Sequence, residues 1–192
     1  MSVAIIDYGA GNIQSIRFAL ERLGVSATLS SNPETIQTAS HVIFPGVGEA
    51  SSAMAKLKST QLYTLIPELT QPVLGICLGM QLMCTSSEEG NTTGLGIFDT
   101  EVVRFSTTRN VPHMGWNKVK GSGVLFEKIP NDSYFYLVHS YYAIPNIYTV
   151  GHCLYDINFA AAMAKNNFYG TQFPPEKSGV MGAQLLQNFL SL

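Results

Sequence analysis

Residues 72–84 read Pro72-Val-Leu-Gly-Ile-Cys-Leu-Gly-Met-Gln-Leu-Met-Cys84, and this stretch decides the fold. Val73 to Ile76 form a short apolar run that is typical of a buried strand, and apolar residues recur at helical spacing from Leu78 onward. Cys77 lies at the join, with a glycine two residues away on each side. A sharp strand-to-helix turn exposes the residue at the turn, and nearby glycines relieve the crowding because they lack a Cβ atom. The stretch therefore predicts a nucleophile elbow with cysteine in place of serine.

Cys77 has two interpretations on this local pattern. As a nucleophile, its sulfur would be approached by the first amides of the following helix, which favour the thiolate. As a structural residue, it would be a buried thiol at the end of a strand, which is common for unpaired cysteine. The rest of the chain decides between the two.

Strand-like and helical segments alternate upstream of the elbow. We expect Asn12 to cap the first helix, strands at 3–6, 27–30 and 41–44, and helices at 13–23, from 33, and at 49–58. This alternation predicts a parallel sheet of the α/β class. Sites in such sheets gather at the carboxyl ends of the strands, where Pro45-Gly-Val-Gly48 and Cys77 both fall.

Downstream of residue 86 the pattern changes to short strand-like runs separated by Gly, Pro and Asn turns. These runs are 96–98, 101–105, 134–138, 148–154, 159–164 and 168–173. They predict an antiparallel extension of the sheet, closed by a helix over 178–192. No repeat, low-complexity tract or linker interrupts the chain, so we expect residues 1–192 to form one domain.

The bulk composition excludes several classes of protein. The net charge is −2 and only 12% of residues are charged, with no basic run, which argues against nucleic acid as the main partner. The three cysteines have no paired spacing, and no stretch is long and apolar enough for a signal peptide or a membrane span. We therefore expect a cytoplasmic protein without a membrane partner.

Four other features carry candidate chemistry. The amides of Pro45-Gly-Val-Gly48 can face an oxyanion together with the amide of Leu78, although a plain turn explains the loop equally well. His139 suits either a site or a structural role, and His113-Met-Gly-Trp-Asn117 suits either a partner surface or the core. Glu176 can orient another group or simply complement a helix dipole. The histidines and cysteines lack ligand spacing, so no metal site is expected.

Taken together, these motifs resemble the triad-type (class I) glutamine amidotransferases. The resemblance rests on Leu74-Gly-Ile-Cys-Leu-Gly-Met-Gln81, Pro45-Gly-Val-Gly48 and Gln172-Phe-Pro-Pro-Glu176. It narrows to the glutaminase subunits of imidazole glycerol phosphate synthase through Asp7-Tyr-Gly-Ala-Gly-Asn12, Pro112-His-Met-Gly-Trp-Asn117 and Tyr136-Leu-Val-His-Ser-Tyr141. The resemblance covers essentially the whole chain. It implies a flavodoxin-like, three-layer α/β sandwich around a mostly parallel mixed sheet.

The resemblance also implies a reaction that needs no cofactor. The thiolate of Cys77 attacks the side-chain amide of L-glutamine and forms a γ-glutamyl thioester, with Glu176 as a second catalytic residue. The implied substrate-binding and oxyanion-binding positions are Gly46, Val47, Gly48, Leu78, Gln81, Glu89, Ser140 and Tyr141.

A partner is implied as well. In this family ammonia passes to a (β/α)8-barrel cyclase subunit within a heterodimer. There it joins a ribotide, giving imidazole glycerol phosphate for histidine synthesis and an aminoimidazole ribotide that feeds purine synthesis. Trp116, Tyr136 and Lys177 resemble positions at the contact with the cyclase.

One position departs from the family pattern, which reads Gln-Phe-His-Pro-Glu at the last strand. Position 174 is proline here, so the histidine that serves as general base and acid is absent. A positioned base or acid typically contributes about 10²–10⁴-fold to the rate. We therefore expect the fold to survive and the glutaminase step to be impaired.

Pro174 has three explanations. It is an engineered or erroneous substitution, a natural variant that uses free ammonia, or a change for which another histidine, His139, compensates. The first two are favoured, because catalytic geometry must be held within about 0.5 Å. A catalytically inactive docking or regulatory partner of the cyclase is the alternative function. A cysteine hydrolase or chaperone-like protein on a related fold would leave the loop at residues 45–48 unexplained.

Overall fold

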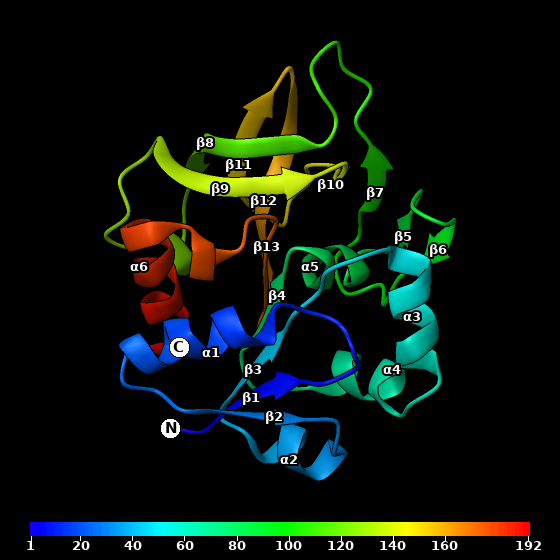
Figure 1. Cartoon of the computed structure of the whole chain (residues 1–192), viewed down its shortest axis with the longest axis vertical. Helices are drawn as coiled ribbons and strands as arrows, with labels where there is room; N and C mark the ends of the chain where they lie inside the picture. Colours follow the sequence, from blue (N-terminus) through cyan, green and yellow to red (C-terminus); the bar gives the residue numbers. More distant parts are fainter.

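The strands of the N-terminal half and the last strand of the chain form the parallel part of a thirteen-stranded mixed sheet in the computed structural model, which describes residues 1–192 (Figure 1). Its strands lie in the order β2-β1-β3-β4-β13 and all run parallel: β2 (Ala27–Ser30), β1 (Val3–Ile6), β3 (His41–Phe44), β4 (Val73–Ile76) and β13 (Phe168–Thr171). Every residue of β1, β3 and β4 is buried. Continuous apolar runs are expected in parallel strands because both faces are covered.

Beyond β13 the sheet continues mainly through antiparallel pairings. The path runs through β12 (Ile157–Lys165), β10 (Tyr141–Ala143) and β7 (Glu101–Arg104) to the short β5 (Ser86–Ser87) and β6 (Thr92–Thr93), and of these pairings only that of β7 with β5 is parallel. Three longer strands branch from β12 and lie at the top of Figure 1: β8 (His113–Gly121), β9 (Ser133–His139) and β11 (Thr149–Tyr155).

Helices cover both faces of the sheet. One face carries α1 (Ile13–Arg22) and α6 (Gly179–Leu190), and the other carries α2 (Pro33–Thr38), α3 (Ala50–Lys58), α4 (Leu62–Leu65) and α5 (Leu78–Leu82). Successive residues of β1 accordingly enter different cores, Ile5 with Leu20 of α1 and Ile6 with Met54 of α3. Short 3₁₀ turns complete the chain: η1 (Ile66–Glu68), η2 (Val124–Phe126) and η3 (Pro175–Lys177). The predicted α/β sandwich with a mixed sheet is confirmed. The sheet is not mostly parallel, however, because the antiparallel pairings outnumber the parallel pairings, seven to five.

Some local predictions differ from the structure. The strand expected at 96–98 is wrong, because the amides of Ile97 and Phe98 both donate to the carbonyl of Met83 instead of a neighbouring strand. The nine-residue strand β8 was not predicted. Asn12 precedes α1, but its side chain makes no capping hydrogen bond. No helix is long and apolar enough to span a membrane.

The elbow depends on glycine, as predicted. A Cβ atom at Gly79 would collide with the carbonyl oxygen of Phe44, and one at Gly46 would collide with the amide of Gly79. A Cβ atom at Gly75 would lie 2.8 Å from the amide nitrogen of Met80. Backbone therefore packs directly on backbone where α5 meets the end of β3. This close approach places the loop at residues 45–48 beside Cys77.

We expect Gly79→Ala to lower the free energy of unfolding by about 3 kcal/mol, because a backbone carbonyl must move to admit the new methyl group. Gly48→Ala is the control, since Gly48 has φ of 97° but open space around it. It should lose only the backbone-strain component, about 1–2 kcal/mol. Urea unfolding of both variants measures the difference, and equal losses would contradict the packing argument.

Candidate active site

Cys77 occupies a strained turn between β4 and α5. Its φ and ψ angles are 53° and −113°, outside the region that most side chains adopt. Its amide donates to the carbonyl of Thr171 over 2.8 Å, which ties the turn to the end of β13. The thiol is free and its residue is half-buried. The geometry is the predicted elbow.

The state of the thiol differs from the prediction. The following helix, α5, is only five residues long, so its dipole is weak. Burial raises the pKa of the Cys77 thiol, the negative charge of Glu176 raises it further, and Lys177 acts in the opposite direction. The resting cysteine is therefore protonated at neutral pH.

A pocket of about 260 Å³ opens beside Cys77. Its lining includes all eight substrate positions expected from sequence, drawn from four separate segments of the chain: Gly46, Val47, Gly48, Leu78, Gln81, Glu89, Ser140 and Tyr141. Val138, His139 and Gln172 complete the lining. The volume suits a single amino acid, since sites for larger ligands start at about 300 Å³.

Backbone amides are available at one side of this pocket. Gly46, Val47 and Gly48 lie outside helix and strand, and their amides donate no hydrogen bond within the chain. Leu78 is the first residue of α5, directly after the nucleophile. Unpaired amides of this kind can stabilise a developing oxyanion.

Gln81 and Glu89 place polar side-chain atoms at the pocket. The Nε2 of Gln81 donates to the carbonyl of Tyr141 over 3.0 Å and to Oε1 of Gln172 over 2.9 Å, so both its hydrogens are used and its oxygen remains free. Oε2 of Glu89 accepts from the amide of Ala50 over 2.9 Å. Glu89 thus places a carboxylate at the pocket, where it can bind a substrate ammonium group.

Pro174 fits its backbone position. Its φ of −75° is within the range of proline, and its carbonyl accepts from the hydroxyl of Ser178 over 2.8 Å. The proline is buried at the point where the strand β13 leads into η3. Proline therefore fits the backbone conformation at this position, as expected from its place at the end of a strand.

One carboxyl oxygen of Glu176 lacks a hydrogen-bond partner. Its Oε2 is buried and makes no hydrogen bond. Burial raises the pKa of this carboxyl from 4.5 to about 7, although a hydrogen bond from its own backbone amide and the charge of Lys177 oppose the shift. Pro174 offers neither an N–H group nor any other side-chain donor to this oxygen.

His139 does not replace the missing base. Its Nδ1 must donate to the carbonyl of Tyr141 over 2.8 Å, which leaves Nε2 to accept from Nδ1 of His113 over 3.1 Å. Nε2 of His113 in turn accepts from Asn117 over 3.3 Å. Burial lowers the pKa of His113 to about 4 and that of His139 to about 3. Both rings are neutral and their nitrogens are occupied, so the compensation hypothesis is wrong for His139.

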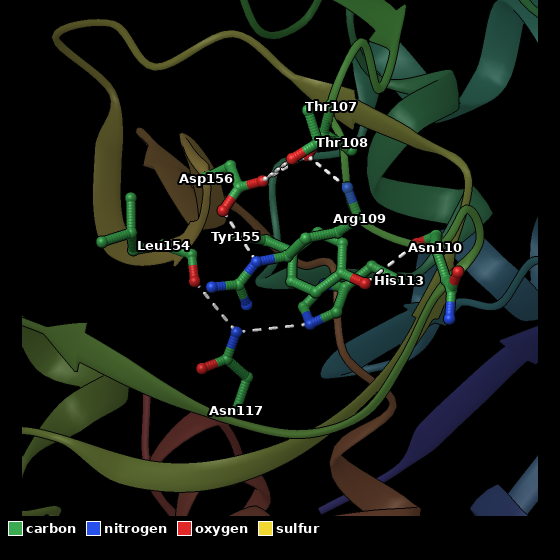
Figure 2. Close-up of polar contacts among 9 residues, drawn as sticks. All are labelled: Thr107, Thr108, Arg109, Asn110, His113, Asn117, Leu154, Tyr155 and Asp156. Atoms are coloured by element: carbon green, nitrogen blue, oxygen red, sulfur yellow. Dashed lines mark hydrogen bonds and ion pairs between the residues drawn. The ribbon is translucent and has the colours of Figure 1, made fainter.

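A polar cluster at the loop after β7 holds His113 in place (Figure 2). Nε of Arg109 pairs with Asp156 over 2.7 Å, and its guanidinium lies 5.0 Å from the centre of the Tyr155 ring. Tyr155 stacks on His113 with ring centres 3.9 Å apart. The exposed ion pair contributes little stability by itself, but the cluster fixes the ring that donates to His139.

A largely exposed apolar ladder runs along β8 and β9, and we define it as Met114, Trp116, Tyr136 and Val138, of which Tyr136 is half-buried. Met114 pairs with Val138 and Trp116 with Tyr136 across the two strands. Trp116 is 55% exposed and Met114 is 68% exposed, so the core-packing interpretation of these two residues is wrong. Val138 also lines the pocket, and Lys177 is exposed on η3 nearby. No group of three or more His, Cys, Asp or Glu side chains is placed to hold a metal ion.

An elbow cysteine above a mixed α/β sheet, with free amides beside it, defines the class I glutamine amidotransferase architecture. The chain matches the family described as glutamine amidotransferase class-I over residues 4–192. A crystal structure of a glutamine amidotransferase shares the fold with a TM-score of 0.78 at 17% identity, covering 98% of this chain and 97% of that chain. PurLQS from Thermotoga maritima gives 0.76 at 16% identity, covering 99% and 97%.

Curated relatives are similar over their full length. Imidazole glycerol phosphate synthase subunit HisH of Bacteroides fragilis (strain YCH46) is 52% identical, with 100% of both chains covered. The HisH subunit of Escherichia coli (strain K12) is 44% identical, again over 100% of both chains. The chain belongs to the class I glutamine amidotransferases and, within them, to the HisH subunits of imidazole glycerol phosphate synthase.

The unpaired carboxyl of Glu176 predicts a pH-dependent effect on stability. Its pKa is about 7 in the folded chain against an ordinary 4.5, so the folded state binds more protons between these pH values. Stability present below pH 4.5 is therefore lost as the pH rises through about 7. We expect Glu176→Gln to raise the free energy of unfolding at pH 8 by about 1–3 kcal/mol, and to give no such gain at pH 4.5.

Urea unfolding at the two pH values measures this effect. Glu21→Gln, which changes an exposed carboxylate on α1, is the matched control and should shift stability little at either pH. A loss of stability at pH 8 in Glu176→Gln would show that the carboxylate has a partner in the folded chain.

Proposed function

We propose that this chain is the glutaminase subunit of an imidazole glycerol phosphate synthase, that it hydrolyses L-glutamine through Cys77, and that Pro174 impairs this step. The observation that carries the proposal is the strained cysteine in an amino-acid-sized pocket beside a carboxyl oxygen without a partner. The ammonia serves a cyclase subunit in histidine biosynthesis. The reaction needs no cofactor.

The pocket supplies the binding steps. Glu89 binds the α-ammonium group of glutamine, while the free oxygen of Gln81, together with Ser140 and Tyr141, orients the rest of the substrate. Cys77 then attacks the amide carbon, and the amides at residues 46–48 and of Leu78 stabilise the oxyanion. Collapse releases ammonia and leaves a γ-glutamyl thioester, which water hydrolyses to glutamate.

Proton transfer is the weak part of the site. The thiol is protonated at rest because burial raises its pKa, so a base must remove its proton before attack. The leaving nitrogen also needs a proton. Neither Pro174 nor the occupied rings of His113 and His139 supplies these transfers.

The cyclase partner fits the exposed ladder. Aromatic residues and methionine are enriched at protein interfaces, and Trp116 and Met114 stand on the outer face of β8. Val138 connects the ladder to the pocket, so a barrel docked there would lie beside the ammonia source. Lys177 adds a positive charge at the same edge. We propose a heterodimer with a (β/α)8-barrel cyclase bound at this surface.

Restoring the family residue tests the impairment. With the cyclase present, Pro174→His should raise glutamine hydrolysis by at least about 10²-fold, because the imidazole would connect Cys77 with the unpaired oxygen of Glu176. Ammonia and glutamate release are measured, with Cys77→Ala in both backgrounds as the control. A native chain already as fast as the histidine variant would refute the impairment. A complex that forms while both chains stay at the Cys77→Ala level would instead support a non-catalytic docking partner.

The interface is tested by removing its largest exposed side chain. Trp116→Ala should weaken binding to the cyclase by roughly 30-fold, the effect of a hot spot worth about 2 kcal/mol. Leu29→Ala is the matched control, since Leu29 is also exposed but lies on β2 at the opposite end of the sheet (Figure 1). Titration of labelled cyclase measures both affinities, and equal affinities would place the contact elsewhere.

A further inference from the structure

A second cavity, of about 70 Å³, also has Cys77 in its wall. Its lining comes from the start of α1, the loop after β3, the end of β4, β9 and the turn at η3. It shares Gly46, Val47, Cys77 and Val138 with the amino-acid-sized pocket, and it adds Pro174 and Glu176. Cys77 therefore lies between the substrate pocket and this smaller cavity, and Glu176 is the only carboxyl group that lines the smaller cavity.

Two polar side chains in this small cavity have no partner within the chain. Oε2 of Glu176 is buried and unpaired, and the side-chain amide of Asn12 makes no hydrogen bond although it precedes α1. A buried water needs about 10–15 Å³ and typically makes about three hydrogen bonds. The cavity thus has room for several waters, and Cys77, Asn12 and Glu176 provide partners for them.

We propose that Glu176 is itself the acid–base group of this chain, exchanging protons with Cys77 and with the substrate nitrogen through water held in the small cavity. This inference rests on the proposed glutaminase function. It assigns to the carboxylate the proton transfers that Pro174 cannot perform.

The proton balance closes with these groups alone. Glu176 accepts the thiol proton through water, and sulfur forms its bond to the amide carbon. When the carbon–nitrogen bond breaks, the carboxylic acid returns that proton through water to the nitrogen, which leaves as ammonia. A water molecule then attacks the thioester and gives its proton to Glu176. The carbon–sulfur bond breaks, the product is the γ-carboxyl of glutamate, and the proton on Glu176 returns to the thiolate.

The surroundings favour Glu176 for this role. The charged or titratable groups facing it are Cys77 on the β4–α5 turn and Lys177 beside it on η3. The walls from α1, from the loop after β3 and from β9 contribute only uncharged residues. The carboxyl pKa of about 7 suits proton exchange at neutral pH, since acid–base catalysis is most effective near the working pH.

The test compares glutamine with the γ-nitrophenyl ester of glutamate, whose nitrophenolate leaving group departs without a proton. Both substrates are hydrolysed by the complex with cyclase, using the native chain, Glu176→Gln and Cys77→Ala over pH 5.5 to about 9, a range centred on the carboxyl pKa. We expect the native rate on glutamine to rise as the pH passes about 7, and Glu176→Gln to lose about 10²-fold on glutamine and clearly less on the ester.

Three results would overturn the inference: a native rate on glutamine no higher than that of Cys77→Ala, an unchanged rate in Glu176→Gln, or equal losses on both substrates. Equal losses would show that Glu176 does not protonate the leaving nitrogen. The proposed function is judged separately by Pro174→His, which restores activity in each of these cases if the pocket is a glutaminase site. Misfolding is checked by the unfolding measurement, where Glu176→Gln is expected to be at least as stable as the native chain at pH 8.

Discussion

The contact of backbone with backbone where α5 meets the end of β3 is the constraint on which the site depends. Gly79 lies against the carbonyl of Phe44 and Gly46 lies against the amide of Gly79, with no room for a Cβ atom at either position. Because no side chain takes part, the distance between Cys77 and the free amides of the loop is set by the sheet itself. The position of Cys77 relative to the oxyanion donors therefore does not depend on whether residue 174 is proline or the histidine of the family pattern.

Much of the fold and the pocket could be predicted because the signals are local and strong. Buried parallel strands are continuous apolar runs, and the glycines around Cys77 leave few alternatives to an elbow. The strand β8 escaped prediction because its outer face carries the exposed Met114 and Trp116, so its hydrophobic pattern does not mark a core. The strand expected near Ile97 was wrong because its backbone hydrogen bonds go to the end of α5, a tertiary contact that no local pattern encodes.

The protonation states could not be predicted from sequence for a related reason. A five-residue helix favours a thiolate much less than a long one, whereas burial of Cys77 beside Glu176 favours the thiol. The sequence left His139 open between a site and a structural role. In the structure, a directed chain of donors from Asn117 through His113 fixes it as a neutral acceptor. That chain ends at the carbonyl of Tyr141, which also accepts from Gln81, so the two histidines shape the pocket and do not exchange protons with it.

Burial of the Glu176 carboxyl explains both its cost to stability and its proposed role in proton transfer. Burying the carboxyl away from bulk solvent, with no hydrogen-bond partner from the chain for Oε2, makes its ionised form less favourable, which lowers stability and raises its pKa toward neutrality at the same time. Proline at position 174 adds no strain of its own, so the backbone does not explain why a carboxyl is retained. A glutamine would fit the same space and remove the cost. If Glu176 served only to orient the histidine ring that is absent at position 174, its burial would lower stability without any benefit. If it exchanges protons through the adjoining cavity, the same burial gives it a pKa that suits acid–base chemistry beside Cys77.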